Sequence, residues 1–208
     1  REDIPIFINS FDWTRPWHAG SHFSSLCVFS ATQLDKSEYL KSKEILYNNV
    51  SLFSNKNTGS YYKGKQPSPK EVINGAMKVL TGLDWLELPI HYPEKLIDFC
   101  LNIIPENDGC DIVDLVYVLF RASKESDYKK KEVVDYLLQT IDLIMNQSYE
   151  DGGFSYFLNK SQTHYGGLLI SEGRPTPDIH GTLLLNWALS MIDNLSETNQ
   201  LNWNILKP

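Results

Sequence analysis

The chain has 208 residues, of which 42% are hydrophobic, and it carries a formal net charge of −7 at pH 7. This length and apolar content allow one substantial core, so we expect a single domain over residues 1–208. The acidic balance disfavours a nucleic-acid partner, because binding to phosphates requires a basic face. No apolar run approaches the ~18 residues of a transmembrane helix. The three widely spaced cysteines indicate reduced thiols and a cytoplasmic location.

Apolar residues recur at helical spacing along most of the chain, and the alternation typical of strands is nearly absent. Seven helices are predicted, and they cover about residues 21–34, 37–53, 69–80, 93–104, 111–121, 133–145 and 179–195. Ser37 is the expected cap of the second helix. Pro69 and Pro93 open the third and fourth, because proline is favoured in the first helical turn. The sequence therefore predicts an all-α protein.

The predicted helix at about residues 111–121 is apolar on most sides, which is typical of a helix in an interior layer. Loops rich in glycine and aromatic residues lie before or between the helices, at residues 58–62, 151–157 and 165–169. Glycine permits tight turns, and aromatic rings fill the gaps between neighbouring helix pairs. Repeated helical hairpins joined by such loops favour a solenoid or a closed ring over an irregular bundle.

Two short segments place reactive side chains at the start of an apolar helix: Asp108-Gly109-Cys110 and Asp178-Ile179-His180. Together they offer a carboxylate, a thiol and an imidazole, the ligand types of a zinc site that keeps one position open for substrate. Asp108 and Cys110 share one loop-to-helix junction, whereas His180 lies about 70 residues further along. The alternative is structural: the aspartates cap helices, Cys110 is a small buried residue and His180 has an ordinary partner.

Downstream, Gln147 precedes Asp151-Gly152-Gly153-Phe154, which resembles the Gln- and aromatic-containing repeat of the terpenoid cyclase and protein prenyltransferase superfamily. The likeness is greatest for protein prenyltransferase β subunits, whose zinc site begins with an Asp-Gly-Cys triplet and ends with a histidine downstream of a Gly-Gly-Leu-Leu segment. Gly166-Gly167-Leu168-Leu169 and His180 are similar in order and approximate spacing. The resemblance covers about residues 108–192 and implies an α/α toroid.

The resemblance also implies a function: a zinc-dependent transferase or cyclase of the prenyltransferase-like class, acting on an isoprenoid or similar apolar substrate. The zinc ligands it implies are Asp108, Cys110 and His180. The catalytic candidates are His180, Asp178 and Tyr165. The substrate-binding candidates are Arg174, for an anionic group, and Tyr117, Trp187 and His164.

The chain departs from the family's pattern in two respects. Seven helices are too few for a complete ring, so we expect a toroid-like partial ring or a fragment of a larger one. The aspartate-rich motifs of terpenoid cyclases are absent, and Asp111-Ile112-Val113-Asp114 does not replace them. A partial ring leaves apolar inner helices in need of cover, which favours a non-catalytic interaction module with a protein partner or a homodimer as one alternative.

A carbohydrate-processing enzyme, either a glycoside hydrolase or a lyase, is the other alternative, because many α/α toroids act on sugar chains. Paired carboxylates would come from the acidic residues of the loops after the sixth helix: Glu150, Asp151, Glu172 and Asp178. His164 and Tyr165 would be the acid/base candidates of a lyase.

His18 and His22 form a second candidate site, because an i, i+4 spacing places two imidazoles on one helix face. We expect the helix to begin only near residue 21, however, and no acidic partner is close in sequence. We therefore interpret the two residues as a cap and a surface histidine.

Overall fold

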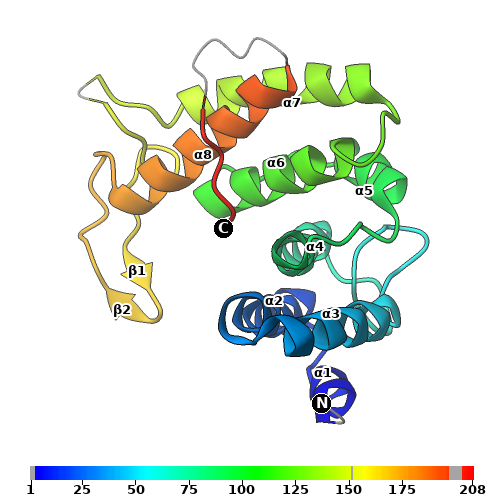
Figure 1. The fold of residues 1–208 in the computed structure, drawn as a ribbon. Coiled ribbons are helices and arrows are strands. Elements are labelled where there is room, and N and C mark those ends of the chain that lie inside the picture. The colour runs from blue at the N-terminus through cyan, green and yellow to red at the C-terminus, as the bar shows by residue number, and fades with distance from the viewer. Residues whose placement is uncertain (1–2, 151, 197–202) are drawn as a thin grey trace. The chain divides into compact units, whose positions relative to one another are not determined.

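The computed structural model describes residues 3–150, 152–196 and 203–208, so that Asp151 lies outside the described residues (Figure 1). Within these ranges the chain forms helices and one short hairpin, which confirms the predicted all-α class. The helices are α1 (Asp3–Asn9), α2 (Pro16–Gln33), α3 (Lys36–Ser51), α4 (Pro69–Leu86), α5 (Pro93–Cys100), α6 (Gly109–Ser123), α7 (Lys130–Met145) and α8 (Ile179–Leu195). None of the described helices is both long and apolar enough to cross a bilayer. The toroid-like ring stays a prediction.

The chain divides into two compact units. Unit 1 comprises Arg1–Ile103, Arg121–Tyr128 and Leu206–Pro208, and unit 2 comprises Ile104–Phe120 and Lys129–Ile205. The boundary falls within α6. The candidate zinc ligands and the other site residues predicted from the resemblance all belong to unit 2.

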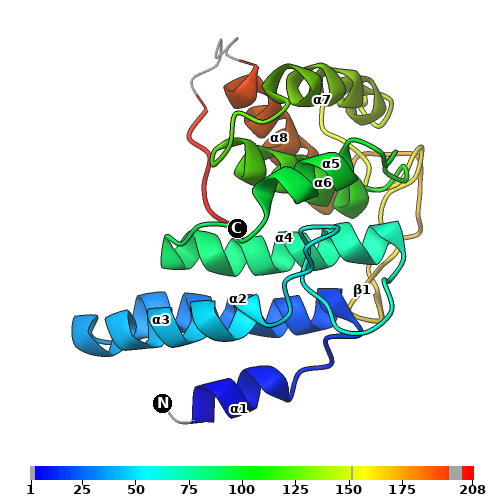
Figure 2. The same cartoon turned by 90° about the vertical axis from the view of Figure 1, so that its right-hand side faces the viewer.

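Unit 1 is built on the contact between α2 and α4, which lie side by side (Figures 1 and 2). Glycines on both helices permit this close approach. A Cβ atom on Gly75 would lie 2.4 Å from Cβ of Pro16, and one on Gly20 would lie 3.0 Å from the Gly75 carbonyl oxygen. Phe23 and Cys27 of α2 are fully buried here.

The N-terminal part of unit 1 differs from the prediction at three points. The structure adds α1, which is only seven residues long and therefore has too few turns to show a clear helical period. Helix α2 begins at Pro16 rather than near residue 21, because proline starts a helix well. Asp35, not Ser37, caps α3, and its carboxylate accepts a hydrogen bond from the Glu38 amide at 2.9 Å.

Unit 2 contains the packed pair α7 and α8, together with most of α6. Residues 112–120 of α6 are all buried, as predicted for an interior helix. The partner proposed to cover this helix stays a prediction. Tyr117 and Trp187, two predicted substrate-binding residues, have ring centroids 5.3 Å apart.

The hairpin of unit 2 pairs β1 (His164–Tyr165) with β2 (Leu168–Leu169) in an antiparallel register. The turn consists of Gly166 and Gly167, both with positive φ, as the first and second positions of a type I′ turn require. The sequence analysis placed these residues in a loop and did not predict the pairing, because two residues per strand are too few to show an alternating pattern.

Two loops share one construction. The loop after α3 carries an antiparallel bridge between Ser54 and Tyr61, and the loop after α7 carries one between Ser148 and Phe154. Each loop is then fastened to the fourth residue of the helix that follows it. Ser60 Oγ donates to the carbonyl of Val72 in α4 at 2.7 Å, and the Phe154 amide donates to Thr182 Oγ1 in α8 at 3.0 Å.

Candidate functional site

The candidate site lies in unit 2, where helices α6 and α8 begin. Asp108 caps α6, since its carboxylate accepts a hydrogen bond from the Asp111 amide at 2.9 Å. Asp178 caps α8 in the same way, accepting from the Gly181 amide at 2.8 Å. The alternative prediction of a capping role is thus confirmed for both aspartates. Capping fixes the two carboxylates and leaves their further chemistry open.

A single extended segment, residues 154–157, connects the two helix starts. The Tyr156 carbonyl accepts a hydrogen bond from the Gly109 amide at 2.8 Å. The Tyr156 amide donates to the second carboxylate oxygen of Asp178 at 2.7 Å. Tyr156 is therefore bonded through its backbone to the first residue of α6 and to the cap of α8.

Glycines in both motifs make this approach possible. A Cβ atom on Gly181 would lie 2.4 Å from the Tyr156 amide nitrogen, and one on Gly109 would lie 3.1 Å from the Tyr156 ring. The glycine of the Asp-Gly-Cys triplet thus has a packing role in this chain. Gln147 is buried and supports the same segment. With its side-chain amide oriented so that the nitrogen faces residues 155 and 156, that nitrogen donates to the carbonyls of Ser155 and Tyr156 at 2.9 and 3.0 Å.

The side chain of Tyr156 contacts two of the three predicted zinc ligands, Cys110 and His180, although Asp108, Cys110 and His180 do not have the ligand-atom spacing of a metal site. Its ring stacks on that of His180 with 5.1 Å between centroids and 15° between planes. Burial first, and then a hydrogen bond with Cys110 and the charge of Asp108, raise the pKa of the Tyr156 hydroxyl well above its usual value. Tyr156 is therefore protonated at neutral pH. The sequence analysis did not single it out, because its position depends on contacts with two distant helices.

His180 is held on several sides. Its Nδ1 lies 2.7 Å from the amide oxygen of Gln162, and the ring of Tyr165 meets it edge-on with 5.7 Å between centroids. Burial lowers the pKa of His180, and the negative charge of Asp178 opposes this effect. The imidazole is accordingly neutral at pH 7, the form that binds a metal or accepts a proton.

An acidic cluster adjoins the start of α6. The carboxylates of Glu106, Asp108 and Asp111 have ligand oxygens within 4.8 Å of one another, and among the described residues this is the group with the spacing of a metal site. Asp108 and Asp111 are buried, whereas Glu106 is exposed. Three carboxylates suit a hard cation such as Mg²⁺ or Ca²⁺ better than zinc. Of these three residues, only Asp108 was predicted as a metal ligand from the sequence, although all precede or open one helix.

The remaining predicted residues lie nearer the surface. Arg174 is exposed and forms an ion pair with Glu172 at 2.6 Å, so both of these candidates already have a charged partner. His164 is exposed in β1 and contacts the hydroxyl of Thr163 at 3.0 Å. Glu150 is exposed, and Asp178 uses its carboxylate for three backbone amides: those of Tyr156, Gln162 and Gly181.

His18 and His22 both lie in α2, contrary to the expected start of that helix. His18 Nε2 lies 2.8 Å from the guanidinium of Arg15, whereas His22 contacts the ring of Phe11 at 5.3 Å between centroids. His22 and Phe11 line an open hollow of about 590 Å³ in unit 1, together with Phe7, Ser10, Asp12, Ser25 and Leu26. The two histidines therefore have separate surroundings.

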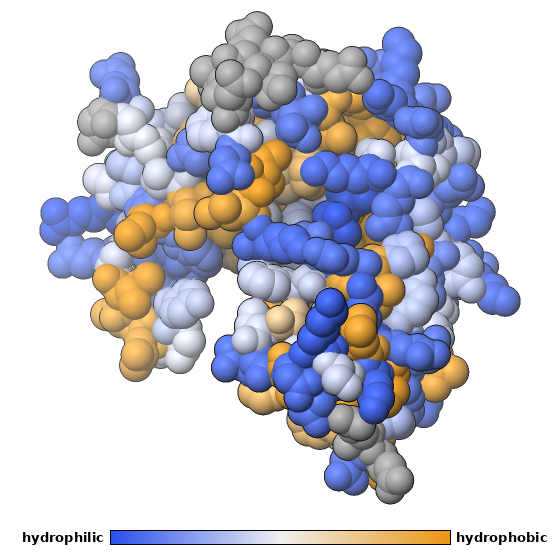
Figure 3. Space-filling model, viewed as in Figure 1, coloured by the Kyte–Doolittle hydropathy of each residue, from blue (hydrophilic) through white to orange (hydrophobic). Residues whose placement is uncertain are grey.

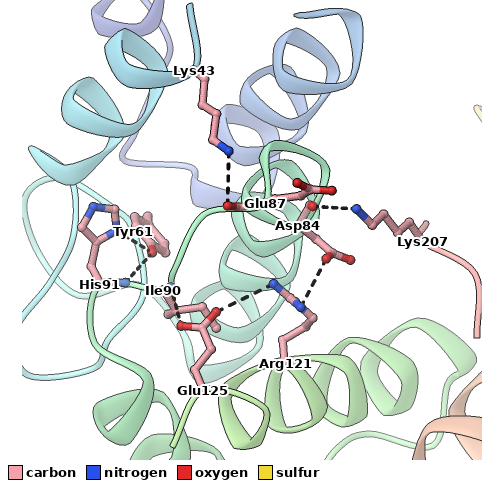
Figure 4. A network of polar contacts seen from close by, with 9 residues as sticks. All are labelled: Lys43, Tyr61, Asp84, Glu87, Ile90, His91, Arg121, Glu125 and Lys207. Atoms are coloured by element: carbon pink, nitrogen blue, oxygen red, sulfur yellow. Dashed lines mark hydrogen bonds and ion pairs between the residues drawn. The ribbon is translucent and has the colours of Figure 1, made fainter. Parts of the chain in front are cut away.

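Unit 1 contains a second tyrosine–histidine pair that the sequence analysis missed (Figure 4). The Tyr61 hydroxyl lies 3.0 Å from Nδ1 of His91, and Tyr47 stacks on the other side of the imidazole. The neighbouring Ile90 amide donates to Glu125 at 2.7 Å. Burial raises the pKa of Tyr61 and lowers that of His91.

A network of charged side chains extends from Glu125. Arg121 lies 3.2 Å from Asp84 and 3.8 Å from Glu125, and Lys207 donates to the Asp84 carbonyl at 2.9 Å (Figure 4). The network joins the end of α4, the end of α6 and the C-terminal residues 206–208 within unit 1.

Comparison with known proteins gives no match: no protein-family model, no curated protein and no solved structure resembles this chain significantly. The functional argument therefore depends on the residues of the chain itself.

Proposed function

We propose that the protein is a metal-dependent enzyme of the prenyltransferase or terpenoid cyclase type, with its reaction centre around Tyr156. The meeting of two predicted ligands at Tyr156 carries this proposal: Cys110 bonds to the Tyr156 hydroxyl, and His180 stacks on its ring. Cys110 and His180 are about 70 residues apart in sequence, so their meeting at one side chain supports a shared role.

Zinc fits the chemistry of these donors, since thiolate, imidazole and carboxylate are its usual ligands. Bound zinc supplies a Lewis acid that keeps a thiol or a water molecule deprotonated near neutral pH. In the proposed site Cys110 and His180 would hold the ion together with Asp108. Tyr156 orients the thiol, and Asp178 holds the Tyr156 segment through the amides it binds.

A hard cation is the competing occupant, and the spacing of the acidic cluster favours it. Asp108 belongs to both ligand sets, so one ion would draw it towards Cys110 and the other towards Glu106 and Asp111. Magnesium bound by carboxylates would also assist the departure of a diphosphate group, because it neutralises the charge on the phosphates.

An apolar substrate is consistent with the surface of unit 2. Figure 3 shows apolar residues gathered along α8 and over the hairpin. Ile179 and Leu183, one turn apart on α8, are 89% and 67% exposed, and Leu168 and Leu169 of the hairpin are each 72% exposed. Tyr165 joins this surface to the centre, because it belongs to the same hairpin and its ring contacts His180. An isoprenoid chain on the hairpin would thus lie beside the proposed ligands.

Titration calorimetry with Zn²⁺ and Mg²⁺ tests which set binds an ion. We expect one zinc per chain, with affinity lost in Cys110→Ala and His180→Ala and retained in Glu106→Gln. Asp108→Asn is informative because asparagine also caps helices, so the fold is maintained while the charge is removed. Binding of Mg²⁺ alone, lost in Glu106→Gln and kept in Cys110→Ala, would assign the acidic cluster instead.

A second assay tests the substrate class. The metal-loaded protein is incubated with a radiolabelled isoprenoid diphosphate, with and without a thiol acceptor, and diphosphate release is measured. The paired change Leu168→Ser and Leu169→Ser should raise the KM several-fold. Leu52→Ser is the matched control, because Leu52 is 70% exposed in unit 1. Absence of turnover in the metal-loaded protein with every isoprenoid length tested would reject the proposed activity.

A further inference from the structure

Gln162 is fixed in place by its own backbone. Its amide donates to the Asp178 carboxylate at 3.0 Å, and its carbonyl accepts from the Ser171 hydroxyl at 2.7 Å. Because its backbone amide and carbonyl are both hydrogen-bonded, the Cα atom of Gln162 has a fixed position, and so does the base of its side chain. Its amide oxygen reaches Nδ1 of His180 at 2.7 Å, a distance typical of a strong hydrogen bond.

The imidazole of His180 is fixed in orientation as well. One face stacks on Tyr156, at 15° between the planes, and Tyr165 meets the ring at 89°. A half-turn of the ring about the Cβ–Cγ bond would keep the stacking but put a carbon atom in place of Nδ1, so the bond to Gln162 selects one ring orientation. The two ring nitrogens of His180 therefore have distinct roles: Nδ1 faces Gln162, and Nε2 lies on the opposite edge of the ring.

The chemistry of Gln162 assigns the proton. An amide oxygen only accepts hydrogen bonds, so the imidazole nitrogen facing it must carry the hydrogen. We propose that Gln162 is a positioning residue that holds His180 as the Nδ1–H tautomer and thereby presents the Nε2 lone pair for metal binding or proton acceptance. The tautomer stands by itself, whereas the use of Nε2 rests on the proposed function.

A neutral partner differs from a carboxylate at this position. Metal-binding histidines commonly donate their second N–H to a carbonyl or a carboxylate, which fixes the ring and its tautomer. A carboxylate would also favour the charged imidazolium, which has no lone pair to offer. Gln162 supplies the orientation without adding a charge at Nδ1.

Nitrogen NMR tests the tautomer directly on the metal-free full chain labelled with ¹⁵N-histidine. The long-range ¹⁵N–¹H pattern of each imidazole distinguishes Nδ1–H from Nε2–H, and His180→Asn assigns the His180 signals among the five histidines of the chain. We expect His180 to be the Nδ1–H tautomer in the wild type. An Nε2–H pattern in the wild type would overturn the proposal.

Two variants separate positioning from packing. Gln162→Leu keeps the backbone bonds but removes the acceptor, so we expect His180 to become a mixture of the two tautomers. Gln162→Glu is the matched control, because it retains an acceptor oxygen and should retain the proton on Nδ1. An unchanged Nδ1–H population in Gln162→Leu would also overturn the proposal.

Metal affinity provides a second readout if the wild type binds zinc. Loss of such an outer contact typically weakens metal binding about 10–100-fold, and we expect a loss in this range for Gln162→Leu. The outcomes are separable from those of the proposed function. A wild type that shows the Nδ1–H tautomer but binds no metal would support the role of Gln162 and reject the metal site.

Discussion

The loops after α3 and α7 have the same construction, but the tyrosine–histidine pairs they form have different surroundings. Both form a bridge within the loop and bond to the fourth residue of the next helix, and each unit pairs a loop tyrosine with a histidine. In unit 1, Tyr61 is fully buried and its hydroxyl meets His91. In unit 2, Tyr156 is bonded to a thiol, beside carboxylates and a half-buried histidine. The first pair closes a core, and the second lies among groups that can react.

The contrast also concerns the second nitrogen of each histidine. Nε2 of His91 is buried, and within the part of the chain that the structure describes it has no hydrogen-bond partner. That nitrogen offers nothing to a ligand. Gln162 instead holds Nδ1 of His180. The two pairs thus share a loop construction but differ in ring geometry and in the polar groups around the histidine.

The largest loss of stability is expected on substitution of Gly181, whose missing side chain allows the Tyr156 backbone to lie against α8. In Gly181→Ala, the new Cβ would lie 2.4 Å from the Tyr156 amide, so the segment or the helix must move. We expect the free energy of unfolding to fall by about 2–3 kcal/mol in urea denaturation. Gly109→Ala is the comparison, because its Cβ would meet side chains rather than backbone, the nearest being the Tyr156 ring at 3.1 Å. An equal or larger loss in Gly109→Ala would contradict the assigned packing.

The two tyrosine hydroxyls should differ in their contribution to stability. Tyr61→Phe removes the partner of the partly buried His91, and we expect a loss of about 1–2 kcal/mol, because an unsatisfied polar group with little access to water is costly. Tyr156→Phe removes a bond to a half-exposed thiol, a weak partner, and should cost about 0.5 kcal/mol. Chemical denaturation of both variants measures the order. A larger loss in Tyr156→Phe would show that the pair in unit 2 is the structural one.

The lowered pKa of His91 should make the free energy of unfolding depend on pH. Burial lowers its pKa below the usual value of 6.5, so the folded chain holds fewer protons at this group than the unfolded chain. Above about pH 6.5 His91 is neutral in both states and lowers stability in neither. As the pH falls below that value, the unfolded chain takes up the proton first, so the free energy of unfolding falls. Glu125, whose pKa burial raises, acts with the opposite sign above about pH 4.5.

The difference between the wild type and His91→Gln isolates the histidine, since Glu125 is present in both. Denaturation at a series of pH values between about 5 and 7 should show a steeper rise in stability with pH for the wild type. Parallel curves of stability against pH for the two proteins would show that His91 does not contribute to the pH dependence.

The smallest loss of stability is expected on substitution of the exposed ion pair of Arg174 and Glu172 in unit 2. Arg174 and Glu172 are 73% and 74% exposed, so solvent screens their ion pair. Arg174→Gln should change the free energy of unfolding by no more than about 0.5 kcal/mol. A measurable rise in the KM for an isoprenoid diphosphate, with stability unchanged, would assign Arg174 to an anionic group of the substrate. A stability loss above about 1 kcal/mol would show that the pair has a structural role.

The sequence predicted those parts of the fold whose signals are local. Helix α8 spans the predicted range, because an N-capping aspartate precedes a long apolar stretch, and Pro69 opens α4 as expected. The start of α2 was wrong, because the Trp-His-Ala-Gly segment after Pro16 has weak helical preference and becomes helical through its contact with α4. The two-residue strands are likewise too short to leave a pattern.

The candidate site was predictable only in part. The motifs at the starts of α6 and α8 identified Asp108, Cys110 and His180 from the sequence. In the structure Cys110 and His180 contact Tyr156, and the zinc site stays a prediction. The sequence did not identify Tyr156, Gln162 or the grouping of Glu106 with Asp111. Those assignments depend on where an irregular loop returns to the helices, and close backbone contacts such as that of Gly181 determine this position.

Cobalt substitution tests the central claim most directly. Co²⁺ replaces zinc in such sites and shows a near-ultraviolet charge-transfer band only when a thiolate binds it. We predict that band on titration of the wild type, its loss in Cys110→Ala and its weakening in His180→Ala, with all three proteins folded by circular dichroism. A titration of the folded wild type without the band would show that Cys110 does not bind the metal, and would contradict the site around Tyr156.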